Sequence, residues 1–231
     1  MPYFLNKKSS IDFDFLDAEE CLNILSDKEK KELVDNKTDL VFEAGEIIVK
    51  RGILVSNILY LNKGLVKLDI VNDNKLSAVG LIQPHSFIGI ICCFAFKKYD
   101  FTVTAIERTD VSFIDINIFE KFIKSNGEFA LNLIRHMSGI TNKMFHRITT
   151  LSQKNIEGAL SILLLDFCNI YRSKDFTLPM TRQELAHLLG YSKESVINTL
   201  SKFNRDGIIK VSDRKIELIN YEKLEQISKL G

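Results

Sequence analysis

The chain has 231 residues, a formal net charge of +1 and 45% hydrophobic residues, enough apolar material to bury a core and to exclude a disordered chain. Its strongest apolar run, residues 160–167, is far shorter than the roughly 18 residues of a membrane span. The N-terminus lacks the basic and apolar regions of a secretion signal. We therefore expect a cytoplasmic protein with no membrane partner, in which any nucleic-acid interaction would have to come from a local motif.

The first elements are expected to be a helix followed by many short strands. Residues 17–36 are predicted to be helical, with Ser26 and Glu29 at the spacing of a capping box. From residue 39 to residue 116, short runs rich in Val, Ile, Leu and Phe alternate with turn signals, a pattern typical of an antiparallel sandwich or barrel. Within this region, residues 66–82 are predicted to form a hairpin that turns near Asp73 and Asn74.

A long helix is predicted to follow, over residues 127–154. Its apolar stripe keeps spacings of four and three residues over about four heptads, which indicates a coiled coil and a parallel homodimer. The alternative is a long helix packed on the chain's own strands. Both arrangements are compatible if one face of the helix contacts the strands and another contacts the partner copy. The predicted dimer stripe consists of Ala130, Ile134, Met137, Thr141, Met144, Ile148 and Leu151.

After a further amphipathic helix over residues 156–171, residues 181–218 carry the spacing of a helix-turn-helix with a wing. Thr181 and Glu184 form a capping box, Gly190 supplies a turn, and Ser192 caps a second helix. Beyond that helix, two short strands are expected to turn at residues 212–214. The side chains expected to hold the two helices together are Leu185, Ala186, Leu189, Val196, Leu200 and Phe203.

The outer N-terminal face of this second helix is expected to contact DNA bases. Lys193, Glu194 and Asn198 are the candidates, since Lys can donate to guanine, Glu can accept from cytosine, and Asn can pair with adenine. The alternative is a capped helical hairpin that binds no DNA. Candidates for phosphate contacts, at two helix N-termini, are Thr181, Arg182, Gln183, Ser192 and Ser195.

Taken in order, these motifs resemble the CRP/FNR family of bacterial transcription regulators along nearly the whole chain. The similarity is strongest over residues 181–203 and the wing, and it includes shorter matches at residues 42–46, 60–68, 87–89 and 156–160. The resemblance implies an α+β fold in three parts. These are an antiparallel β-roll sensor with flanking helices over residues 1–126, a dimerisation helix over residues 127–154, and a winged helix-turn-helix over residues 155–231.

The resemblance also implies partners. A homodimer would bind a pseudo-palindromic operator in double-stranded DNA, with two recognition helices about 34 Å apart, and RNA polymerase is a further candidate partner. The family carries an Arg where this sequence has Asn198. We therefore expect a different operator sequence.

The family's cyclic-nucleotide cassette is degenerate in this chain. Cyclic-nucleotide members place a Glu directly after the turn that this chain makes at residues 87–89, and an Arg pair further along holds the phosphate; both are replaced here. A buried phosphate needs such a cationic fork, so we expect weak or no cyclic AMP binding, and either an unidentified, apolar small-molecule effector or none. The candidate effector pocket consists of Gly89, Ile90, Tyr99, Asp100, Met144 and Phe145.

A thiol- or haem-based gas or redox sensor of the same family is an alternative. The cysteines show no C-x-x-C spacing and are expected to be free thiols. Cys21 is the one cysteine near the N-terminus, which argues against an iron–sulfur cluster, and the adjacent Cys92 and Cys93 are expected to be buried on a strand. No metal site is predicted. Haem is the one candidate cofactor, with ligands of suitable type at His85, His136, His146, Met137, Met144 and the cysteines.

Two other classes of protein fit less well. A metal-dependent β-barrel enzyme needs closely spaced strand histidines, whereas His85 is the one histidine in the β region. The sequence also contains no G-x-S-x-G, P-loop or H-E-x-x-H motif, so an enzyme is not expected. A pure protein-interaction module is disfavoured by the helix-turn-helix.

Overall fold

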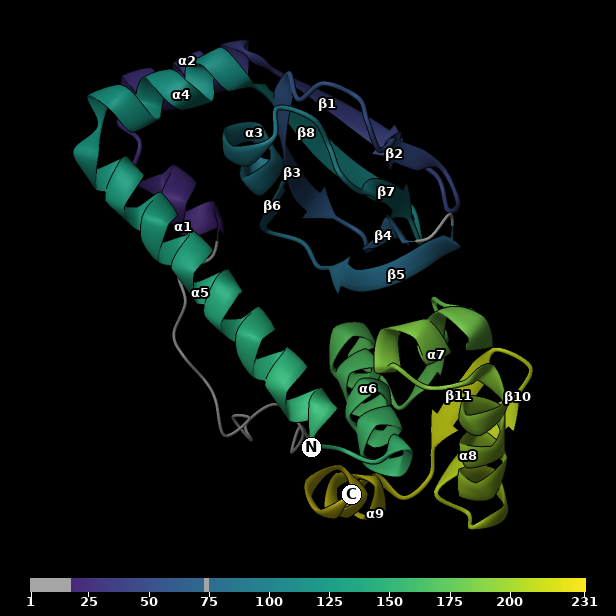
Figure 1. Cartoon of the computed structure of the whole chain (residues 1–231). Helices are drawn as coiled ribbons and strands as arrows, with labels where there is room; N and C mark the ends of the chain where they lie inside the picture. Colours follow the sequence, from purple (N-terminus) through teal and green to yellow (C-terminus); the bar gives the residue numbers. More distant parts are fainter. Residues whose placement is uncertain (1–17, 73–74) are drawn as a thin grey trace.

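The structure is a computed structural model that describes residues 18–72 and 75–231. A β-roll with flanking helices lies at one end, a long helix runs from it, and a compact unit of helices and short strands lies at the other end (Figure 1). The predicted fold class is confirmed. Residues 73 and 74, where the β4–β5 turn was expected, lie outside the described residues.

The helix expected over residues 17–36 is in fact two helices, α1 (Ala18–Asn23) and α2 (Asp27–Asp35). The Ser26 side chain accepts a hydrogen bond from the Glu29 N–H, and the Glu29 carboxylate accepts one from the Ser26 N–H. This is the predicted capping box. Because a capping box satisfies the free N–H groups of a helix start, it marks a boundary that a continuous helix would not have.

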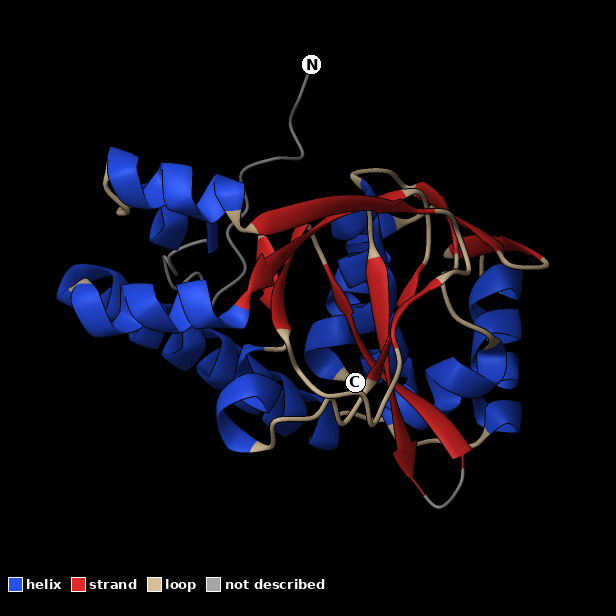
Figure 2. Cartoon of the chain, turned by 90° about the horizontal axis from the view of Figure 1, so that it is seen from above, coloured by secondary structure: helices blue, strands red, loops and turns tan. Residues whose placement is uncertain are grey.

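The roll consists of two four-stranded antiparallel sheets. One has the order β1–β8–β3–β6 and the other β2–β7–β4–β5. In Figure 2, helices lie on both sides of the strands. The predicted hairpin is β4 paired with β5, in a register that sets Asn72 opposite Lys75. The strands are β1 (Lys37–Phe42), β2 (Ile47–Val49), β3 (Asn57–Lys63), β4 (Val66–Asn72), β5 (Lys75–Ile82), β6 (Ser86–Ile88), β7 (Thr102–Ala105) and β8 (Thr109–Asp115).

The segment with the adjacent cysteines is a helix, α3 (Ile90–Ala95), and the expectation of a strand there was wrong. Gly89 has φ 97°, a left-handed conformation that ends β6 and lets the chain turn into α3. Cys92 and Cys93 are buried, as expected. An uninterrupted apolar run has neither the strand nor the helix period, so its sequence pattern does not distinguish the two.

Helices α4 (Ile116–Ser125) and α5 (Gly127–Ser152) join the roll to the rest of the chain. The first turns of α5 pack on α1 and α4 through buried aromatic rings, with Phe119 and Phe129 centroids 5.4 Å apart in an edge-to-face arrangement. Further along, α5 extends beyond the roll toward the C-terminal unit (Figure 1). In the described part of the chain, no helix has the length and apolar character to cross a membrane.

The C-terminal unit is built around α6 (Ile156–Tyr171). Helix α9 (Tyr221–Leu230) packs on α6 so closely that the backbones of Gly158 and Gly231 leave no room for a Cβ. No helix was predicted over these last residues. The remaining elements are β9 (Asp175–Thr177), α7 (Arg182–Leu189), α8 (Lys193–Arg205), β10 (Ile209–Ser212), β11 (Lys215–Leu218) and α9 (Tyr221–Leu230), with the strands in the order β10–β11–β9.

Candidate DNA interface and sensor groove

Helices α7 and α8 form a tight helix-turn-helix. The Thr181 hydroxyl caps α7 in a capping box with Glu184, and Gly190 ends α7 in a left-handed conformation with φ 74°. Ser192 then caps α8, its hydroxyl accepting from the Ser195 N–H at 3.1 Å. Each cap satisfies one of the free N–H groups at a helix start, so local bonds fix where the two helices begin.

The expected core positions of α7 and α8 are all buried. Ala186 and Val196, where the helices approach each other, are 0% exposed. Near the start of α8, Lys193, Glu194 and Asn198 are exposed. The three predicted base-contacting residues therefore share the outer face of a rigidly held helix, and we call them the recognition face.

The predicted phosphate contacts are placed at the two helix starts, with their hydroxyls already in use as acceptors. Thr181 and Ser192 accept cap bonds, and the Ser195 hydroxyl lies 3.0 Å from that of Ser192. A hydroxyl that accepts still has its one proton to donate. Thr181 therefore keeps a donor for a phosphate, and one of Ser192 and Ser195 does, because the other donates within the pair. Gln183 is exposed, with Nε2 2.7 Å from Nε2 of His187.

Arg182 has a different environment from the one expected. Its Nη2 donates to the Asp213 carbonyl in the wing turn at 2.5 Å, while Nη1 is buried without a hydrogen-bond partner among the described residues. Burial lowers the pKa of the guanidinium. The Asp213 backbone at this contact has φ 52°, which is unfavourable for a residue other than Gly. Arg182 thus ties the wing to the start of α7.

Two residues of α8 that were not predicted as site residues line the same recess as Arg182. Asn204 accepts from the Val211 N–H at 2.8 Å, which ties β10 to α8. Asn204 and Arg205 also line a recess of about 390 Å³ that Arg182 shares. A basic residue in the last turn of α8 was visible in the sequence, but its place beside the wing depends on the fold of the strands.

The predicted effector-pocket residues do not form a single site. Tyr99 is buried in the roll, donates to the Asn57 carbonyl at 2.8 Å, and has its ring so close to Gly89 that a Cβ there would lie 2.8 Å from Cε1. The pKa of this phenol is raised, mainly by burial. The Asp100 carboxylate accepts from the Cys92 thiol at 3.1 Å. These residues consolidate the roll next to α3.

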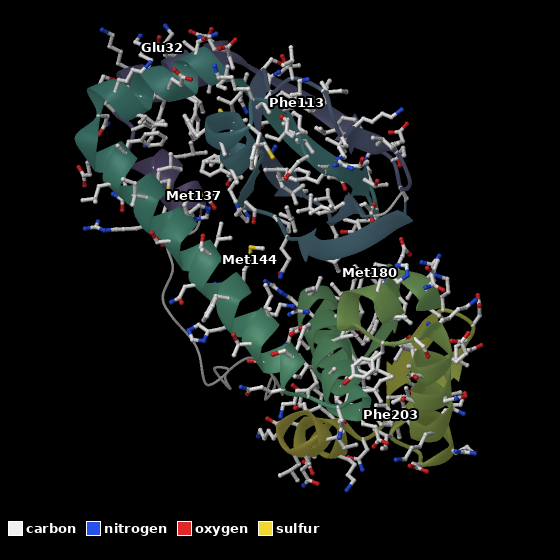
Figure 3. The ribbon with its side chains drawn as sticks, in the orientation of Figure 1. Glu32, Phe113, Met137, Met144, Met180 and Phe203 are labelled. Atoms are coloured by element: carbon white, nitrogen blue, oxygen red, sulfur yellow. The ribbon has the colours of Figure 1, made fainter. Side chains whose placement is uncertain are left out.

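An open groove of about 730 Å³ lies instead between α3, α4 and α5. Ile90 and Phe145 are the predicted pocket residues that line it, whereas Met144 lies on α5 outside its lining (Figure 3). All of its described lining residues are uncharged. They are Ile90, Phe94, Ile123, Ala130, Leu133, Ile134, Met137, Ser138, Thr141, Asn142 and Phe145.

The predicted dimer stripe runs along this groove and beyond it. Within it, Met137 packs partly against the helical core beside the roll, and Leu151, the last residue of the stripe, packs partly against the C-terminal core. Between them, Ile148 is 66% exposed, and Thr141 and Met144 are also exposed. The helix therefore packs within the chain at some stripe positions and presents apolar side chains to solvent at others, and a second copy on that face stays a prediction.

The cysteines and histidines are placed for structure more than for chemistry. Burial raises the pKa of Cys92 and Cys93 to about 11 each, which leaves little thiolate at neutral pH. His136 is buried edge-on to Phe87, with ring centroids 5.9 Å apart. His85 lies 3.0 Å from a Glu19 carboxylate oxygen. The described residues contain no group of three or more His, Cys, Asp or Glu placed to hold a metal.

The fold and the recognition face define a class: a DNA-binding regulator with a sensor roll joined to a winged helix by a long helix. Comparison with family models specifies it. The model for a cyclic nucleotide-binding domain matches residues 39–126, and the model for a Crp-like helix-turn-helix domain matches residues 159–227. The chain belongs to the CRP/FNR family of transcription regulators. Its relatives in this family are transcription regulators and not enzymes.

Relatives support this assignment at low identity. Electron transport regulator A of Shewanella oneidensis is 24% identical over 192 residues, which cover 80% of this chain and 76% of that protein. The anaerobic regulatory protein of Bacillus subtilis is 24% identical over 72% of this chain and 73% of its own length. Among solved structures, a CRP/FNR-family regulator from Eubacterium rectale has the same fold, with a TM-score of 0.77, 20% identity, and coverage of 90% of this chain and 96% of that one.

Proposed function

We propose that the protein is a homodimer that binds a pseudo-palindromic operator, with α8 of each copy in a major groove. The observation that carries this is the exposed recognition face of Lys193, Glu194 and Asn198 on a helix that is capped, packed and flanked by a wing. In such motifs the N-terminal residues of the second helix reach the base edges. The helix starts of α7 and α8 supply phosphate contacts.

The dimer part of the proposal is supported by the exposed apolar side chains along α5. Large apolar side chains spaced at heptad positions on an exposed helix face are unfavourable in water and favourable against a second copy of the same helix. Ile134 and Ile148 are 62% and 66% exposed. A parallel pair of α5 helices would bury them.

The sensor part of the proposal concerns the groove between α3 and α5. Its uncharged lining suits an apolar molecule and offers no cation for a cyclic phosphate. Because α5 lines both the groove and the expected dimer contact, an occupant would touch the helix that joins the two functions. A protein that needs no effector remains the alternative, and thiol chemistry is disfavoured by the raised pKa of Cys92 and Cys93.

The experiment is to incubate the purified protein with fragmented genomic DNA and to sequence the retained fragments. We expect enrichment of a short inverted repeat, and retention without sequence preference would contradict the proposal. Two relatives are named for electron transport and for anaerobic regulation. Promoters of respiratory genes are therefore the first operators to test.

A further inference from the structure

The C-terminal unit contacts the sensor roll through α7, the first helix of the helix-turn-helix. Helix α7 packs against β5 (Figure 1), and Leu81 of β5 joins the hydrophobic core of the C-terminal unit. Beside this contact, Nζ of Lys67 on β4 donates to Oε1 of Glu184 on α7. The two residues are 117 positions apart in the sequence.

Three charged groups make up this contact. Lys67 Nζ also lies 3.4 Å from Oδ1 of Asp69, and the side chains of Lys67, Asp69 and Glu184 are 17%, 8% and 21% exposed. An ion pair this far from water is screened less than a surface pair. Its net contribution is reduced by the hydration that the charges lose, but the loss of one partner would leave the other charges uncompensated away from water, so the contact favours one arrangement of the two units.

The carboxylates depend on Lys67. Burial works against the Glu184 carboxylate, but the hydrogen bonds from Lys67 and Thr181 outweigh it and lower the Glu184 pKa. Burial raises the pKa of Asp69, and the nearby Glu184 adds to this. Removing Lys67 would leave two carboxylates facing each other in a poorly solvated site, which favours separation of the two units.

Glu184 transmits this contact to the DNA-binding surface. Its other oxygen accepts from the Thr181 N–H at 2.7 Å, so the carboxylate is fixed to the start of α7. The next residue, Arg182, donates a hydrogen bond to the Asp213 carbonyl in the wing turn. Meanwhile the recognition face of α8 stays exposed in the docked arrangement. Docking thus orients the winged helix without covering the face that would meet bases.

We propose that Lys67, a residue of the sensor roll, is a positioning residue for DNA binding: by holding Glu184, it fixes the winged helix on the β4–β5 edge in an orientation ready for the operator. This rests on the proposed function. A dimer whose two winged helices are held in place loses less freedom on binding two half-sites than one whose winged helices swing on α5.

The test is operator binding by the full-length protein, measured by fluorescence anisotropy over a series of salt concentrations. Lys67→Met should weaken binding on the order of tenfold, the size of a typical coupling between sites. The slope of log affinity against log salt should stay unchanged, because Lys67 neutralises no phosphate. Lys121→Met is the matched control, since Lys121 pairs with Glu32 within the helices beside the roll, and it should bind as wild type.

A second variant separates the ion pair from the helix cap. Glu184→Gln keeps a capping-box acceptor for Thr181 but removes the charge, and it should weaken binding less than Lys67→Met because Lys67 keeps Asp69. The double variant Lys67→Met, Glu184→Gln should bind no worse than Lys67→Met alone, which is the signature of coupled residues. Thermal unfolding and light scattering on each variant establish that fold and assembly are retained.

Several results would overturn the inference. Tighter operator binding by Lys67→Met would mean that the contact restrains the winged helix, and unchanged binding would mean that it has no part in DNA binding. A salt slope smaller by about one would reassign Lys67 as a phosphate contact. If the wild-type protein shows no operator preference, the proposed function fails. If the wild-type protein prefers the operator and its variants bind equally well, the inference about Lys67 fails and the proposed function stands.

Discussion

Ile148 is the side chain through which the proposed dimer can be tested most quantitatively. It is 66% exposed near the end of α5, within the predicted stripe. Fully burying an isoleucine is favourable by about 1.5–3 kcal/mol, so burying the exposed two-thirds contributes about 1–2 kcal/mol in each copy. Alanine would retain part of this, so Ile148→Ala should cost the dimer roughly 1.5–3 kcal/mol, or about 10- to 150-fold in Kd.

The assay is sedimentation equilibrium over a concentration series, which gives the dimer Kd directly. Val34→Ala is the control, because Val34 is 58% exposed on α2 and lies outside the stripe. A charge at the centre of the stripe, as in Met144→Glu, should abolish the dimer. The argument fails if Ile148→Ala and wild type give the same Kd, or if wild type stays monomeric throughout the series.

Further predictions concern DNA, thiols and ligands. Glu194→Ala should cost about 1–3 kcal/mol on the preferred operator and relax base choice at one position, whereas equal binding to every site would show that α8 is wrongly assigned as the recognition helix. Arg182→Ala should weaken binding to all sequences alike, because it removes both the bond to the wing turn and any contact of Arg182 with a phosphate. Loss of binding confined to one operator sequence would contradict this. Cys92 and Cys93, with pKa about 11, should react with a disulfide reagent at pH 8 much more slowly in the native than in the unfolded protein, and equal rates would refute their burial. Calorimetry should detect no micromolar binding of cyclic AMP, and a titration that saturates would contradict the prediction that the sensor roll does not bind this nucleotide.

The parts of the fold that local chemistry determines were predictable from the sequence. Both capping boxes, at Ser26 and at Thr181, have their bonding partners three residues away. Gly190 was recognisable because a left-handed turn between two apolar helices favours glycine. The winged helix-turn-helix was therefore anticipated almost residue by residue, apart from α9.

The sensor was harder to predict because its features depend on distant contacts. The apolar run after Gly89 gives no period that distinguishes helix from strand, so α3 was missed. Tyr99 was a pocket candidate by its position in the family pattern, but its ring packs on Gly89 inside the roll. The ion pair of Lys67 and Glu184 joins elements that no sequence pattern places side by side.

The proposed function requires two copies of the chain to place two α8 helices on one operator. Native mass spectrometry of the protein mixed with an enriched inverted-repeat duplex tests this directly, with a duplex of the same composition and scrambled order as the comparison. We expect two protein chains on each inverted-repeat duplex and far less complex on the scrambled one. One chain per duplex, or equal complex on both duplexes, would contradict the account.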